Sequence, residues 1–374
     1  MRQHILSIIT AVAMFATMPA TAQNDNSSFS VMTLNVDGLP GKILFFNVNE
    51  NGPKVWGSEA ISFYLTAKNC DIVAMQEDFN YHWEIMSFLL FNYERDEWTG
   101  GIDLFTITDE DLIHPQNFKL KCDGLNTAWK KNCQSTGYER VAWNRNFGKF
   151  SPGGDDLITK GFRRHEVTLQ DGTEVVVYNM HMDASDPRDI RVGNEAKDRE
   201  TRLSQWEQLR LHIMERLDNR PVVVMGDMNC YYYRDDIKTA FIDAIQSTGR
   251  ATVGDVWVEK QLGGIYPELG SEPLADETLD KVFYINPTNA NTVIIPTSVE
   301  IDKTYYVADG KPLGDHYPLI VHFDIAPAGE TTGISTVGAA TSDGDEWYSL
   351  QGVRQDANAK GISINRSGQK RLRK

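Results

Sequence analysis

The stretch Pro221–Asn229, P-V-V-V-M-G-D-M-N, constrains the fold of this 374-residue chain more than any other. Its four consecutive apolar residues, Val222–Met225, predict a short strand buried on both faces, and such a strand belongs to a sheet that is covered on both sides. Gly226 ends the apolar run. Asp227 and Asn229 then lie two residues apart, which directs a carboxylate and an amide to one side of the chain. By itself such a pair is more often only a turn, so its meaning depends on the other strands.

Several other predicted strands also end in polar residues. Strands are predicted at Phe29–Asn35, Asp71–Glu77, Gly161–Leu169, Glu174–Met180, Leu279–Asn286 and Leu319–Phe323. Their ends supply Asn35, Glu77, His181, Asp183, Asp227, Asn229, Asp280, Asp315 and His316. Polar groups at the tips of buried strands converge on one rim of an α/β domain. Taken singly, Asn35 or Asp280 is explained as a turn cap and His181 as a hydrogen-bonded core histidine.

This mixture of side chains suits metal-assisted phosphoryl transfer. A hard cation takes oxygen ligands from carboxylates, amides and water. A histidine paired with a carboxylate activates a water molecule, and cationic or amide donors hold the phosphate. The sequence therefore favours a phosphoryl-transfer site at the rim.

The remaining elements are predicted from periodicity. Helices are expected from about Ile61 to Lys68 and at His82–Leu90, Lys197–Leu217 and Ile237–Ser247. Their apolar faces are expected to include Trp83, Met86, Leu89 and Leu90, and then Leu203, Trp206, Leu209, Leu211, Ile213 and Leu217. An Asp171-Gly172 hairpin joins two strands. Asp96–Asn146 is the least regular part, where we expect substrate specificity to lie.

The two ends of the chain differ in composition from the middle. Residues 1–22 have the pattern of a secretory signal peptide cleaved after Ala22, so we expect an exported, secreted or periplasmic protein; a buried N-terminal helix is the alternative. Residues 28–325 are expected to form the catalytic domain. Residues 326–374 begin as a linker and continue as a polar tail, in which the run from Trp347 could still form a strand.

Charge and cysteine content limit the classes of partner. The formal net charge of −15 gives no basic surface for nonspecific binding of a polyanion. This argues against nucleic acid, although acidic nucleases that work through bound cations keep that alternative open. We expect a monomer.

Four cysteines in an exported chain permit disulfides. Cys122 and Cys133 are the preferred pair, and Cys70 and Cys230 are expected to be buried thiols.

Six short motifs, in chain order, resemble those of the endonuclease/exonuclease/phosphatase superfamily. They are L-N-V at Leu34–Val36, Q-E at Gln76–Glu77, M-H-M-D at Met180–Asp183, G-D-M-N at Gly226–Asn229, L-D-K-V-F at Leu279–Phe283 and G-D-H-Y-P at Gly314–Pro318. Six motifs in family order are far more specific than any one of them. The last motif of the family usually begins with Ser, so Gly314 removes one hydroxyl near the metal.

The resemblance implies an α/β fold, a four-layer α/β/β/α sandwich of the DNase I-like type, with one site for Mg²⁺ or, alternatively, Mn²⁺ or Co²⁺. It implies that Glu77 is the principal metal ligand, with Asn35 and Asp315 nearby. His316 would be the general base, oriented by Asp280. The remaining implied roles are positioning of the nucleophile and phosphate by Asp227 and Asn229, charge stabilisation by His181, and substrate binding by Asp183 and Lys160.

One segment points to a branch of this superfamily. Gly153–Phe162, G-G-D-D-L-I-T-K-G-F, is similar to a segment of secreted neutral sphingomyelinases, in which Lys160 would lie close to a phosphate; a turn with a solvated lysine is the alternative. The segment between Pro296 and Pro312 carries Tyr305 and Tyr306 but lacks the long apolar hairpin that bacterial members press into membranes. Peripheral contact with a lipid surface would then depend on other aromatic residues, such as Trp98 and Trp129.

Three functions remain open at this stage. The leading one is a secreted Mg²⁺-dependent phosphodiesterase acting on a sphingolipid or related phospholipid. The nearest alternative is a secreted nuclease or a sugar- or inositol-phosphate phosphatase of the same superfamily. A non-catalytic binding module is the third. A degenerate member of this kind should have lost one of the following residues, and all are present: Glu77, Asp227, Asn229, Asp280 and His316.

Overall fold

The computed structural model describes residues 27–43, 46–47, 49–103, 119–148, 155–185, 194–304, 306–308, 311–329, 347–349, 354–355, 361–365 and 370–373. The chain divides into two compact units, Met1–Ala328 and Gly329–Lys374. The predicted signal peptide lies outside the described residues. Within the described part of the chain, no helix combines the length and apolar character needed to cross a membrane.

The first sheet of the larger unit contains six strands in the spatial order β13, β16, β1, β4, β6, β5. Their bounds are Thr292–Ile301, Leu319–Pro327, Ser28–Asn35, Ile72–Gln76, Asn126–Lys130 and Tyr93–Arg95. β1 runs parallel to β4 and antiparallel to β16. As a result, β1 and β4 deliver Asn35 and Glu77 to the same edge of the sheet.

The second sheet also contains six strands, in the order β11, β12, β10, β9, β8, β7. Their bounds are Ala251–Asp255, Asp280–Pro287, Val222–Asp227, Glu174–His181, Gly161–Thr168 and Gln134–Ala142. The valine-rich β10 lies near the centre, parallel to β9 and antiparallel to β12. All six of its residues are buried, as the unbroken apolar run predicted.

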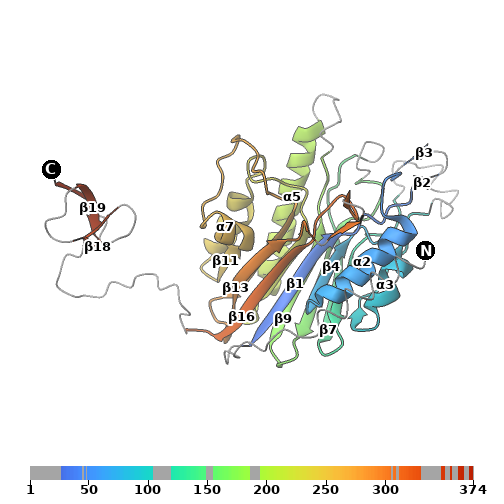
Figure 1. The fold of residues 1–374 in the computed structure, drawn as a ribbon, viewed down its shortest axis with the longest axis horizontal. Helices are drawn as coiled ribbons and strands as arrows, with labels where there is room; N and C mark the ends of the chain where they lie inside the picture. Colours follow the sequence, from blue (N-terminus) through green and yellow to red (C-terminus); the bar gives the residue numbers. More distant parts are fainter. Residues whose placement is uncertain are drawn as a thin grey trace. The chain divides into compact units, whose positions relative to one another are not determined.

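The two sheets pack face to face and helices cover their outer faces (Figure 1). The inter-sheet core contains Val31, Ala74, Val177, Val223 and Val321. α2 (Lys54–Lys68) and α3 (His82–Leu89) cover the first sheet. The second sheet is covered by α5, the π-helical turn η2, α6 and α7, which span Asn194–Arg216, Lys238–Asp243, Ala244–Gln246 and Val256–Gln261. The predicted four-layer α/β/β/α sandwich is confirmed.

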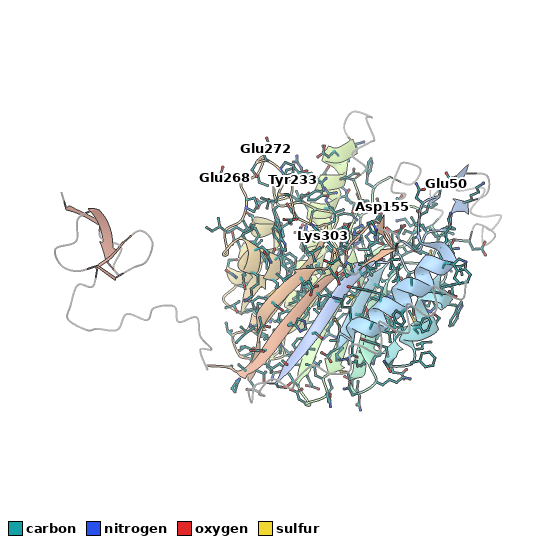
Figure 2. All side chains as sticks on the ribbon, viewed as in Figure 1. Glu50, Asp155, Tyr233, Glu268, Glu272 and Lys303 are labelled. Atoms are coloured by element: carbon teal, nitrogen blue, oxygen red, sulfur yellow. The ribbon has the colours of Figure 1, made fainter. Side chains whose placement is uncertain are left out.

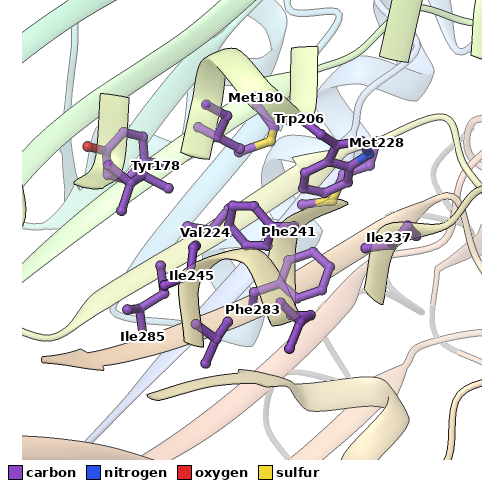
Figure 3. Packing of buried hydrophobic residues seen from close by; sticks show 14 of the residues in the cluster. Tyr178, Met180, Trp206, Val224, Met228, Ile237, Phe241, Ile245, Phe283 and Ile285 are labelled. Carbon is purple, nitrogen blue, oxygen red and sulfur yellow. The ribbon is translucent and has the colours of Figure 1, made fainter. Parts of the chain in front are cut away.

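An aromatic cluster fixes the helical layer against the second sheet. Trp206 of α5 packs against Phe241 of η2 and Phe283 of β12, with ring centroids 5.0 and 5.8 Å away (Figure 3). All three side chains are fully buried. Truncating one such aromatic residue to alanine typically costs about 3–5 kcal/mol of stability, so this cluster is a principal support of β10 and β12.

Several predictions of surface and element bounds were wrong. α3 buries His82, Ile85, Met86 and Leu89, the i, i+3, i+4, i+7 stripe, so Trp83 and Leu90 lie one position away from the core and are exposed. Leu203 and Leu211 of α5 are exposed for the same reason. Strand β16 continues to Pro327, two residues into the predicted linker.

The region Asp96–Asn146 is more regular than predicted because it contains β6 and β7. β7 is an edge strand whose residues alternate between half-buried and exposed, so its sequence carries little apolar signal. β13 was also missed. It contains Pro296, which lies at a register shift in its pairing with β16, and proline in a strand is tolerated at such irregularities.

The preferred disulfide between Cys122 and Cys133 is wrong, since all four cysteines are free and buried. Cys122 precedes β6 and Cys133 follows it. The five-residue strand β6 lies between the two cysteines and spans roughly 16 Å. A disulfide tolerates a Cα separation of only about 7 Å. Each thiol instead fills space in a different hydrophobic cluster.

The smaller unit contains four short strands in the order β18, β17, β19, β20. They span Arg354–Gln355, Trp347–Ser349, Gly361–Asn365 and Lys370–Arg373. The predicted tail therefore has strand structure of its own.

The larger unit also contains two minor ladders. They are formed by β2 (Lys42–Ile43) with β3 (Phe46–Asn47) and by β14 (Val307–Ala308) with β15 (Lys311–Pro312).

Candidate active site

The site is built around Asp227, the last residue of β10. The side-chain amide of Asn35, at the end of β1, donates to Asp227 Oδ2 (3.1 Å) and to Glu77 Oε1 (2.9 Å). Asn35 thereby links the two sheets, because β1 belongs to the first sheet and β10 to the second. The three side chains lie together at the edge where β1, β4 and β10 end, as the strand-end pattern predicted.

Strand register brings His181 and Asp280 to the two sides of Asp227. In the second sheet, Asp227 is opposite His181 of β9 and opposite Asp280 of β12. Directly opposed residues in neighbouring strands have their side chains about 5 Å apart. Two polar positions that are distant in sequence therefore flank one carboxylate.

His316 completes a chain of contacts with these carboxylates. Its Nδ1 lies 2.6 Å from Asp280 Oδ2, and its Nε2 lies 3.6 Å from Asp227 Oδ2. Burial opposes a positive charge on His316, but the adjacent Asp280 and Asp227 outweigh it and raise its pKa well above the usual value. Thr278 also donates to Asp280 Oδ2, at 3.1 Å. Asp280 therefore fixes the ring and leaves Nε2 facing the site.

His181 Nε2 is also close to Asp227, 3.4 Å from its Oδ2, but His181 has a cation beside it as well. Lys160 Nζ lies 3.1 Å from His181 Nε2 and donates to the Met182 carbonyl oxygen at 3.2 Å. Burial and the positive charge of Lys160 lower the pKa of His181 to about 3, so its ring is neutral at ordinary pH. Asp155 forms an ion pair with Lys160 and lies at the same end of the sandwich (Figure 2).

The backbone at the strand ends is held in uncommon conformations. Glu77 and Asn229 have φ values of 55° and 50°, which are infrequent for residues other than glycine and cluster at functional sites. Asp227 Oδ1 accepts the Asn229 N–H (3.0 Å), and the Asn229 amide donates to the Met182 carbonyl oxygen (3.0 Å). At Gly226, a Cβ would lie 2.0 Å from the Met180 carbonyl oxygen, so only glycine fits there.

Asn229, His181 and Lys160 are thus brought together with Asp227, whereas Asp183 is placed differently. Its carboxylate is fully buried and accepts the Phe147 N–H at 2.8 Å, and its own N–H donates to Gln205 of α5 at 3.0 Å. This placement suits support of the surrounding loops better than contact with a substrate.

Three acidic side chains, Glu77, Asp37 and Asp315, lie close enough together to oppose one another's ionisation. Burial and the charge of Asp315 raise the pKa of Glu77 to about 7. Burial, Asp315 and Glu77 raise the pKa of Asp37 to about 8. Asp315 is the exposed member of the group. A bound cation would relieve the repulsion among these carboxylates.

These donors fit a magnesium ion held largely by water. Among the described residues, no group of three or more His, Cys, Asp or Glu side chains could hold a metal by itself. Mg²⁺ usually keeps several water ligands and needs only one or two carboxylates together with substrate phosphate, which Glu77 and Asp315 can supply. Asn35 directs its N–H groups at both neighbouring carboxylates, and its oxygen accepts the Asp37 N–H at 3.0 Å.

The sequence analysis missed Asp37 and Asp155. Asp37 follows Asn35 by two residues, has a φ of 51° and lies close to Gly314, where a Cβ would approach the Asp37 Cβ to 3.2 Å. Asp155 is separated from Lys160 by five residues, so the i, i+5 pair lay within the segment already singled out. An acidic residue near a predicted ligand was the available signal in both cases.

Of the two aromatic residues named as candidate lipid contacts, one is buried and the other is partly exposed. Trp129 is buried in the inter-sheet core on β6, and its prediction is therefore wrong. Trp98 is half-buried and stacks on His82, with centroids 4.6 Å apart. The exposed tryptophans among the described residues are Trp56 and Trp83.

Comparison with known proteins bears on the fold. No family model and no curated protein matches the sequence. Similar structures include an endonuclease/exonuclease/phosphatase from Bacteroides vulgatus, with 15% identity, a TM-score of 0.52, and coverage of 80% of this chain and 100% of the other. A Staphylococcus aureus beta toxin variant with bound magnesium ions has 17% identity, a TM-score of 0.51, and coverage of 79% and 99%.

A third similar structure is D. rerio TDP2 complexed with a single-strand DNA product, with 16% identity, a TM-score of 0.50, and coverage of 80% and 99%. At such identities the likeness establishes architecture. The resemblance carried by the six motifs is confirmed at that level: this chain has the fold of the endonuclease/exonuclease/phosphatase superfamily.

Proposed function

We propose that this chain is a metal-dependent hydrolase that cleaves a phosphodiester by attack of water on phosphorus. The observation that carries the proposal is the position of His316, which is oriented by Asp280 through Nδ1 and presents Nε2 toward Asp227. A histidine oriented by a buried carboxylate, beside a cluster suited to a hard cation, is the arrangement that general-base hydrolysis requires.

Each residue then has a defined task. Neutral His316 Nε2 accepts the proton of the attacking water as its oxygen bonds to phosphorus, and Asp280 stabilises the imidazolium that forms. The phosphorus–oxygen bond to the leaving alcohol breaks, and the alkoxide takes a proton from solvent. Asp227 and Asn229 orient the water and the phosphate. Lys160, with neutral His181 beside it, provides positive charge for the phosphoryl oxygens. A magnesium ion at Glu77 and Asp315 would supply Lewis-acid stabilisation of the negative charge that develops on phosphorus-bound oxygen.

The substrate class that we propose is a phospholipid or sphingolipid. Its support is the similarity of the Gly153–Phe162 segment to secreted neutral sphingomyelinases, together with the position of Lys160 beside His181. The net charge of −15 is unfavourable for a polyanion such as nucleic acid. The likeness to TDP2 bound to a DNA product keeps a nuclease as the second candidate.

We further propose that the protein is exported and acts as a monomer in peripheral contact with a membrane surface. Export is supported by the composition of residues 1–22. Self-association is opposed by the repulsion between copies of so acidic a chain. Fractionation of the producing cells and sedimentation of the purified protein test these two statements.

The substrate proposal is tested with purified protein and a panel of substrates, each with Mg²⁺ and with a chelator. The panel contains sphingomyelin vesicles, phosphatidylcholine vesicles, plasmid DNA, inositol phosphates and a soluble bis-aryl phosphodiester. Turnover of a lipid and of the aryl diester, dependent on Mg²⁺, is expected. Cleavage of DNA alone would assign the chain to the nucleases, and release of inorganic phosphate alone would assign it to the phosphatases.

The Glu77→Gln variant tests the metal site. The change keeps the shape of the side chain but deletes the charge that a hard cation requires, so most of the Mg²⁺-dependent activity should be lost while thermal unfolding stays close to wild type. Glu207→Gln on the exposed face of α5 is the matched control. Wild-type rates at ordinary Mg²⁺ would refute the assignment, and recovery at high Mg²⁺ would restrict Glu77 to tuning affinity.

A further inference from the structure

The outer face of α2 and α3 has an unusual surface for a charged protein. From Val55 to Asn92 no exposed residue is charged, although 24% of the whole chain is Asp, Glu, Lys or Arg. Trp56, Phe91 and Trp83 are 83%, 72% and 62% exposed. Phe63 and Phe88 are also exposed, and their rings meet edge-to-face at 5.8 Å. These five residues are called the aromatic face.

Helix α5, in the opposite outer layer, shows what an ordinary solvent-facing helix of this protein looks like. Its exposed positions include Glu195, Lys197, Arg199, Glu200, Glu207 and Glu215, with Leu203 and Leu211 as isolated apolar residues. On α2, Lys54 is the single exposed charged residue, and the other exposed positions are Val55, Trp56, Ala60, Phe63 and Ala67. Contiguous exposed apolar surface of this kind marks an interaction site, whereas single exposed residues do not.

The aromatic face begins beside the candidate active site. α3 starts five residues after Glu77, and Trp83 packs on His82, which bonds to Asp78 (2.6 Å), the neighbour of Glu77. The first turn of α2 lies beside the segment that carries Asp315 and His316, since a Cβ on Gly57 would be 3.9 Å from the Leu313 carbonyl oxygen. Figure 1 shows the two helices side by side on one face of the molecule.

We infer that the aromatic face is the surface by which this protein rests on a lipid bilayer with zwitterionic headgroups, so that the active-site rim lies next to the substrate. The inference rests on the proposed lipid substrate. Tryptophan and phenylalanine side chains partition into the boundary between headgroups and acyl chains, where their apolar rings leave water.

The charge distribution favours a zwitterionic lipid surface over nucleic acid, an anionic membrane or a second copy of the chain. The charges that border the aromatic face are few and balanced. Lys54 is exposed at the start of α2, Lys68 pairs with Asp302, and Arg95 lies over the Trp83 ring, while Glu59, Glu84 and Glu94 are acidic. No basic patch is therefore available for the phosphates of nucleic acid or of an anionic membrane. A second copy of the chain would bring another formal charge of −15 against the first, which opposes self-association. A zwitterionic lipid surface has no net charge, so it matches an aromatic face whose bordering charges balance on an otherwise acidic protein.

The test is flotation of purified protein with phosphatidylcholine–sphingomyelin vesicles in the presence of a chelator, which prevents turnover. Wild type is compared with the double variant Trp56→Ala/Trp83→Ala and with Leu203→Ala/Leu211→Ala on α5 as the matched control. We expect the aromatic variant to bind vesicles at least tenfold more weakly and the α5 variant to bind as wild type does. Hydrolysis of the soluble aryl diester should be unchanged in both.

Each outcome separates this inference from the proposed function. Equal flotation of all three proteins, or no flotation of wild type, overturns the docking surface while leaving diester hydrolysis in place. Vesicle binding that depends on Trp56 and Trp83, in a protein that hydrolyses none of the substrates, supports the surface and refutes the function. A concentration-dependent dimer that the aromatic variant abolishes would assign the face to a second copy.

Discussion

At the scale of single residues, Asp227 occupies the position on which the site depends, because two histidines with opposite electrostatic surroundings face it. Burial and Lys160 keep His181 neutral, whereas Asp280 and Asp227 favour the protonated form of His316. Two chemically identical side chains thereby acquire different tasks. In the proposed function, His316 accepts a proton only in its neutral form, so the rate should rise with pH through its raised pKa, and neutral His181 provides polar stabilisation.

The His316–Asp280 pair provides the sharpest prediction at this scale. His316→Ala removes the proton acceptor and should lower kcat for the soluble diester by about a hundred- to ten-thousand-fold. Asp280→Asn keeps the shape but loses the charge that holds the ring and stabilises the imidazolium, so it should also be severely impaired. The double variant should be little worse than His316→Ala, since groups that act as one unit are non-additive.

Steady-state kinetics of the two single variants and the double variant check this prediction, with unfolding temperatures as the control for folding. If the loss of kcat in the double variant equals the product of the two single losses, His316 and Asp280 act independently. Asp280 would then belong to the metal or phosphate shell instead of orienting His316.

The residues of the site were predictable where a motif or a strand end marked them. Asn35, Glu77, Asp227 and Asp280 stand at the tips of strongly apolar strands, so their convergence followed from the pattern alone. Asp37 and Asp155 lie in loops whose paths depend on tertiary contacts, including the Asn49 side chain that donates to Asp37. Local sequence does not encode such paths, so these two residues emerged only from the structure.

At the scale of elements, buried strands and helices were predictable and edge elements were not. β10 and β4 are apolar runs that only a covered sheet can hold, and α5 buries Trp206, Leu209 and Ile213 at helical spacing. β7 and β13 lie at the outer edges of the two sheets, where alternation is weak and a proline is tolerated. Their strand structure is imposed by the neighbour with which each pairs.

One ion pair ties β8 to the turn that precedes β10, and it makes stability depend on pH. Arg220 bonds Glu166 through two contacts, of 2.9 and 3.1 Å. Hydrogen bonds from Arg220 lower the pKa of Glu166 from 4.5 to about 2. A carboxylate whose folded pKa is depressed stabilises the fold above its unfolded pKa and loses this contribution as pH falls toward the folded value.

Glu166→Gln should therefore lower the unfolding temperature at pH 7, and its difference from wild type should shrink between about pH 4.5 and pH 2. Thermal unfolding monitored by circular dichroism across this range checks it. Glu207→Gln, an exposed residue of α5, is the control and should show no such convergence. A difference that stays constant with pH would mean that Glu166 contributes through packing instead of charge.

At the scale of the whole molecule, the boundary between the two units follows directly after β16. Ala326 and Pro327 pair with Val293 and Thr292 of β13, and the division lies between Ala328 and Gly329. Composition had placed the start of the linker at Ala326, because Ala, Pro and Gly are also linker residues. The observed boundary lies later than Ala326 because Ala326 and Pro327 still pair with β13. Composition alone does not reveal strand pairing.

This boundary yields the last prediction. A chain ending after Gly329 keeps all of β16, so it should hydrolyse the soluble diester at the wild-type rate and unfold at the same temperature. A chain ending after Ile325 loses the last strand pairs and the buried Ala326, and should be destabilised by roughly 1–3 kcal/mol. Paired denaturation curves of the two truncations measure the difference. Insolubility or inactivity of the longer truncation would show that the smaller unit is required for the sandwich to fold.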